Sequence, residues 1–188
     1  MGRKDMKAKL WVIIGVLIIA SIAMVAPVAA VNTGTTIIAG NPPATVDIAL
    51  SGDIANMPLT PGTTNTDPSV TLTVSANVPF YVKVRDDMSS AKPAGSAGKM
   101  VDYETGPTTY GTAKLGAAMG LTGTTLDTTS KTDLAALTAV DQTLETGSAA
   151  VSSQGLGLTF SQVVAYTDAR LGAGHVYRIV VLFTGSPS

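Results

Sequence analysis

Hydrophobic and polar positions alternate in short runs along most of the chain after residue 43. Alternation over four to eight residues is typical of a strand with one face buried. The clearest cases are residues 69–76 and 80–85, which we predict to form a hairpin because only residues 77–79 separate them. Their inward positions are expected to be Val70, Leu72, Val74, Phe80, Val82 and Val84.

Further runs extend this pattern. Residues 175–184 have hydrophobic side chains on both faces, which predicts a strand covered on both sides, followed by a tail at 185–188. Residues 52–68 are rich in proline and glycine and are expected to be turns. Residues 131–140 have leucines at helical spacing, and a short strand pair is the alternative there. The remaining expected strands are 44–51, 99–103, 112–119 and 156–164.

About eight short strands with little helix predict an all-β fold, an antiparallel Ig-like β-sandwich. The predicted sandwich is one domain at 44–188, and residues 31–43 form an N-terminal arm or first strand.

Residues 1–30 have the order of an export signal, so a signal-peptide helix is expected before the sandwich. A basic start is followed by the apolar run 10–25, and small residues occupy Val28 and Ala30, where a signal peptidase would bind. The alternative is an uncleaved membrane anchor over residues 10–30. Either interpretation predicts an extracellular or cell-surface location.

Charge and cysteine content narrow the possible functions. Beyond residue 30 the chain has eight basic and twelve acidic residues, a net charge of −4, which argues against nucleic acid as a partner. The chain has no cysteine, so thiol catalysis and zinc–thiolate sites are excluded.

Four stretches together resemble secreted Ig-like β-sandwich surface proteins of archaea, particularly methanogens, similar in style to WxL-type cell-surface domains. These stretches are residues 51–62, 69–76, 77–84 and 177–184. The tripeptide W-x-L itself is absent, since the only tryptophan is Trp11. The resemblance implies an extracellular structural or binding module without catalytic residues to transfer.

Candidate chemistry is sparse. His175 is the only histidine, and the chain has no G-x-S-x-G motif that would supply a serine nucleophile, so we predict no catalytic site and no enzyme. Two acidic pairs, Asp86 with Asp87 and Asp102 with Glu104, are candidate calcium ligands because Ca²⁺ prefers oxygen donors. The alternative for these acids is solvated loop positions. Calcium is the one cofactor considered.

The segment after the signal is the candidate for assembly. Thr35, Thr36, Ile37, Ile38 and Ala39 form an uncharged, β-prone run that is able to add to the edge of a neighbour's sheet. Pairing within its own fold, or disorder, is the alternative. We therefore predict a non-enzymatic surface or adhesion protein that contacts itself or other surface proteins. The alternatives are a carbohydrate- or calcium-binding module and a secreted hydrolase.

Overall fold

The computed structural model describes residues 39–88, 91–124 and 129–188. The chain divides into two compact units, Met1–Asn41 and Pro42–Ser188. The predicted signal helix and most of the arm lie outside the described residues. Ala39 is described, and it is exposed and outside any strand. No helix within the described part of the chain is long and apolar enough to cross a membrane.

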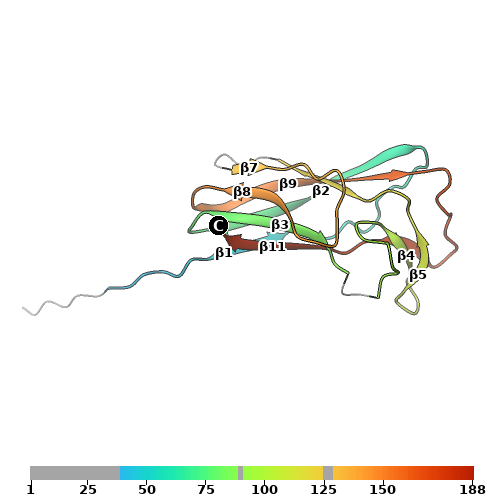
Figure 1. Ribbon diagram of the computed structural model, residues 1–188, viewed down its shortest axis with the longest axis horizontal. Helices are drawn as coiled ribbons and strands as arrows, with labels where there is room; N and C mark the ends of the chain where they lie inside the picture. Colours follow the sequence, from blue (N-terminus) through green and yellow to red (C-terminus); the bar gives the residue numbers. More distant parts are fainter. Residues whose placement is uncertain (1–38, 89–90, 125–128) are drawn as a thin grey trace, which may run out of the picture. The chain divides into compact units, whose positions relative to one another are not determined.

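The second unit is built from antiparallel strands, as predicted, and its described residues contain no helix (Figure 1). One four-stranded sheet has the order β1 (Val46–Leu50), β2 (Thr63–Ala76), β9 (Val151–Val164) and β6 (Gly120–Gly123). A second has the order β11 (Val181–Pro187), β3 (Phe80–Asp86), β8 (Gln142–Gly147) and β7 (Thr129–Lys131). A three-stranded sheet has the order β10 (His175–Arg178), β4 (Val101–Glu104) and β5 (Thr109–Lys114).

The inward positions predicted from alternation form the core. They come from both four-stranded sheets and belong to one cluster of buried side chains. Burying an aliphatic or aromatic side chain of this size contributes roughly 1.5–3 kcal/mol, so these strands hold the unit together. The members with no exposed surface include Leu72, Val74, Phe80, Val82, Val84, Leu156 and Leu158.

The predicted hairpin of residues 69–76 and 80–85 is wrong. β2 pairs with β1 and β9, whereas β3 pairs with β11 and β8, so the two strands belong to different sheets. Asn77–Pro79 therefore carries the chain from one sheet to the other. Alternation predicts that each strand exists, but it does not predict the partner of each strand. β2 pairs with β9, so that Leu72 lies opposite Leu156, about 85 residues later in the chain.

The predicted single strand 175–184 is two strands in different sheets, β10 and β11, joined by Ile179 and Val180. It is also not covered on both sides, because Val176 is 47% exposed and Leu182 is 38% exposed. The predicted tail at 185–188 is wrong as well, since β11 continues to Pro187 in register with Phe80.

Two other expectations also need correction. Residues 131–140 form no helix: Leu134 pairs with Leu121 in an isolated bridge, and Leu137 is buried without helical neighbours. Leu134 and Leu137, three residues apart, thus belong to an irregular segment that covers a sheet edge. Residues 63–68, expected to be turn, begin β2, which accommodates Pro68 through an irregularity between Asp67 and Val70. Eleven strands are described where about eight were expected.

Candidate functional site

A groove of about 990 Å³ lies within the second unit. One wall is the segment 50–61, and the other includes residues 168–171 and 175–181. Its floor is formed by core side chains, among them Met57, Met100 and Phe160. Leu50 and Val176, at 46% and 47% exposure, present apolar surface to solvent along it. The groove is therefore largely apolar and accessible.

The strands β1 and β11 lie close together at one end, and both line the groove at the other end. At Gly185 an added Cβ would lie 2.9 Å from Val46 and 3.0 Å from Ile48, so the absence of a side chain allows this approach. The groove is lined by the other ends of these strands, at Leu50 and Val181. The two strands thus form a gap that opens toward Leu50.

The buried side-chain amide of Asn65 holds the segment that follows β1. Asn65, on β2, accepts the Thr60 N–H at 2.8 Å and donates to the carbonyls of Thr60 at 3.2 Å and of Gln162 at 3.3 Å. Gly62 has φ 80°, and a Cβ there would lie 2.7 Å from the Tyr166 ring. These contacts hold one wall of the groove in place.

A polar cluster forms the rim. His175 Nδ1 lies 2.8 Å from Asp102 Oδ1, and the two side chains are 33% and 14% exposed. The Arg178 guanidinium lies over the Tyr103 ring at 4.4 Å. The Tyr177 hydroxyl donates to the Ala169 carbonyl at 2.6 Å. Burial, and then the negative charges of Asp168 and Asp102, raise the pKa of Tyr177 above its ordinary value of 10.0.

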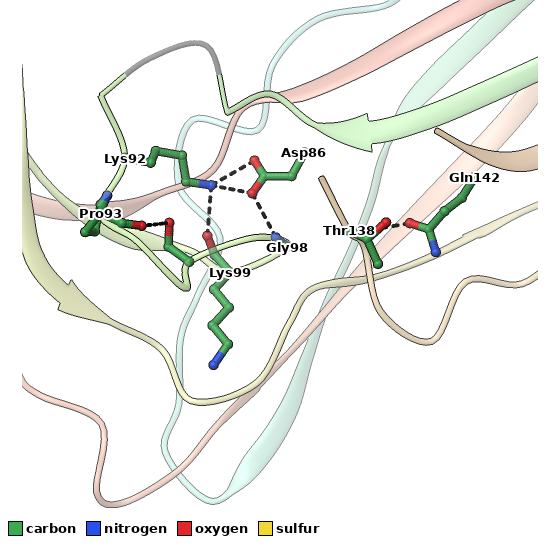
Figure 2. Close-up of polar contacts among 8 residues, drawn as sticks. Asp86, Lys92, Pro93, Gly98, Lys99, Thr138 and Gln142 are labelled. Atoms are coloured by element: carbon green, nitrogen blue, oxygen red, sulfur yellow. Dashed lines mark hydrogen bonds and ion pairs between the residues drawn. The ribbon is translucent and has the colours of Figure 1, made fainter. Parts of the chain in front are cut away.

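Asp86 does not face solvent as a loop acid would. It ends β3, and its carboxylate oxygens lie 2.8 and 2.5 Å from Lys92 Nζ, with neither side chain exposed (Figure 2). The same carboxylate accepts the Gly98 N–H at 2.8 Å, and Lys92 also donates to the Lys99 carbonyl at 3.2 Å. Both oxygens are therefore used within the protein, and they fix the loop that follows β3.

The other predicted calcium ligands have contacts of their own. Asp87 donates its N–H to the Val180 carbonyl, Asp102 contacts His175, and Glu104 is opposite His175 in the β4–β10 register. Within the described ranges, no three acidic or histidine side chains lie close enough to hold a metal ion together. Calcium binding stays a prediction from separate carboxylates.

Sequence reasoning missed both polar pairs, although a signal for one was present. Asp86 continues the parity of Phe80, Val82 and Val84, so alternation alone places it on the buried face. A buried carboxylate needs a partner, which predicts a nearby cation such as Lys92. The His175–Asp102 contact depends on the pairing of β4 with β10, 73 residues apart, for which the sequence carries no local signal.

Asp168 also uses its carboxylate within the protein. Its carboxylate accepts the N–H groups of Ala165 at 2.8 Å and Gly116 at 2.9 Å.

Thr35, Thr36, Ile37 and Ile38 lie outside the described residues. Comparisons with family models, with curated proteins and with solved structures return no match for this chain.

Proposed function

We propose that this is an exported, non-enzymatic protein of the cell surface, built on an Ig-like β-sandwich, that assembles by adding residues 31–39 of one copy to the sheet edge of another. Residues 1–30 direct export and are removed after Ala30. The two four-stranded antiparallel sheets that share one core cluster support the sandwich.

The observation that carries the proposal is a difference between sheet edges. The edge strand β6 is covered, because Leu121 and Leu134 exchange both backbone hydrogen bonds, at 2.8 and 2.9 Å. The edge strands β1 and β11 each pair with one strand only among the described residues. An uncovered edge presents unpaired N–H and C=O groups that pair readily with another chain.

The side chains of these two strands agree with an edge meant for pairing. Val46, Ile48, Val181 and Phe183 pack against the core but are only partly buried. Leu121 of β6 and Leu144 of β8 have no exposed surface. Adding a strand beside β1 or β11 would complete the burial that the fold leaves unfinished there.

The test is assembly of the exported chain, residues 31–188, with charges placed in the arm. We expect wild type to form oligomers or filaments with rising concentration, measured by light scattering and electron microscopy. The double variant Ile37→Asp/Ile38→Asp is expected to stay monomeric, because strand addition in either register would bury one of the two unpaired charges.

The matched control is Ala139→Asp/Val140→Asp, which adds the same two charges to an exposed turn. It is expected to assemble as wild type does. A wild-type protein that stays monomeric at its highest soluble concentration, or an arm variant that assembles normally, would overturn the proposal.

A further inference from the structure

We infer that the groove is the acceptor for residues 31–39 of a second copy, so that copies join head to tail. This inference rests on the proposed function and adds the surface on which the arm binds.

The chain enters β1 at the end of the strand that lies away from the groove. The chain enters β1 at Val46, where three hydrogen bonds to Asn77 hold it. Asn77 Nδ2 donates to the Pro43 carbonyl at 2.7 Å, its Oδ1 accepts the Thr45 N–H at 2.8 Å, and its N–H donates to the Thr45 carbonyl at 3.3 Å. The groove begins at Leu50, the other end of the strand. The connection to the arm thus joins β1 at the end away from the groove.

The connection between the arm and β1 is restricted in conformation. Asn41 and Pro42 each precede a proline, which disfavours helical conformations and favours extended ones at these two residues. The groove of a neighbouring copy is therefore the better match for the arm, and such a heterologous contact propagates into an open chain of copies.

The arm and the groove are chemically complementary. The side chains of residues 31–39 carry no charge, and the one charge of the cleaved arm is the α-amino group at its free end, on Val31. The apolar floor and the exposed Leu50 and Val176 match whichever of Ile37 and Ile38 faces inward, while charged side chains such as Asp53, Asp168 and Arg178 lie along the walls. The uncharged side chains of residues 35–39 enter this space without leaving a charge unpaired.

The backbone that borders the groove belongs to edge strands. β10 pairs only with β4, and β11 only with β3, among the described strands. An extended peptide has the N–H and C=O groups to pair with such an edge, and alternate side chains to place on the floor. A compact small molecule would use the floor but not the edge.

The experiment compares two valines with equal exposure. Val176 lines the groove and Val163 does not, and both are 47% exposed. In the exported chain, Val176→Lys is expected to raise the concentration needed for assembly at least about tenfold, whereas Val163→Lys leaves it unchanged. Circular dichroism and a thermal melt of both variants confirm that each is folded.

Mixing the variants separates the two proposals. Val176→Lys keeps an intact arm, and Ile37→Asp/Ile38→Asp keeps an intact groove, so a mixture is expected to form one-to-one heterodimers that grow no further. Size-exclusion chromatography with light scattering measures their mass.

Each other outcome overturns one proposal or both. Normal assembly of Val176→Lys, or a mixture without heterodimers, overturns the groove as acceptor while arm-dependent assembly still stands. A monomeric wild type whose arm resists protease until Val176→Lys is introduced shows that each copy fills its own groove, which overturns both proposals.

Discussion

The carboxylates of Asp86 and Asp102 each contact a basic side chain at almost the same distance, yet their surroundings differ. Asp86 and Lys92 are 2.5 Å apart with no exposed surface, whereas Asp102 and His175 are 2.8 Å apart and 14% and 33% exposed. The first pair is enclosed by its own loop, and the second lies at the rim of the groove. The buried pair of Asp86 and Lys92 therefore stabilises the fold, whereas the partly exposed pair of Asp102 and His175 is accessible to a partner.

The largest effect is expected from breaking the buried pair. Lys92→Met leaves the Asp86 carboxylate buried without its cation, which costs about 3–5 kcal/mol. Lys131→Met is the matched control, because Lys131 forms an exposed pair with Asp133 at 3.1 Å, and such pairs contribute less than about 1 kcal/mol. Urea denaturation measures both free energies of unfolding. Equal losses in the two variants would show that the Asp86 pair is not the stabilising element.

A smaller effect is expected from the glycine beside each pair. Gly98 donates to Asp86 and has φ 72°, and a Cβ there would lie 1.8 Å from the Leu137 carbonyl oxygen. Gly174 precedes His175, has φ 81°, and has nothing within 4 Å. Gly174→Ala adds backbone strain of about 1–2 kcal/mol. Gly98→Ala adds a backbone collision and should cost more, about 3 kcal/mol in total. Thermal melts of the two variants compare these losses, and a Gly174→Ala loss as large as that of Gly98→Ala contradicts the prediction.

The smallest effect concerns pH at the rim. Because the pKa of Tyr177 is raised in the folded state, the folded protein keeps this proton at pH values where the unfolded chain has lost it. Its contribution to stability is therefore complete below about pH 10 and falls as pH rises further. Tyr177→Phe should make the loss of stability above pH 10 shallower, measured by urea denaturation from pH 8 upward. Parallel curves for wild type and variant would contradict this assignment.

The fold was predictable where burial follows a simple period. The inward faces of β2 and β3, and an all-β antiparallel fold, follow from alternation alone. The pairing of strands did not, because it depends on contacts between distant segments: Leu72 meets Leu156 and not a residue of the next strand. The two-faced run 175–184 was misinterpreted because hydrophobic residues on both faces also suit a strand pair that changes sheet at Ile179.

The candidate site was predictable in part for the same reason. Parity along β3 places Asp86 inward, and its partner Lys92 is six residues away. The groove is different, since it is lined by β1 and β11, strands at opposite ends of the second unit's sequence. No local pattern in either strand indicates how far apart they lie.

The hydrogen bonds at the turn between β2 and β3 have a mechanical consequence. The Pro43 carbonyl is held by Asn77, and the Ser188 N–H donates to the Pro79 carbonyl at 3.0 Å, so both ends of the second unit leave at one corner. Pulling these ends apart would peel β1 and β11 away one hydrogen bond at a time. In the proposed filament, a pulling force would instead act on each copy at that corner and at its groove. Such a force would load β1 and β11 along their length. Strands loaded in this way resist by breaking many hydrogen bonds together, so the assembled protein should withstand far more force than an isolated copy pulled by its ends.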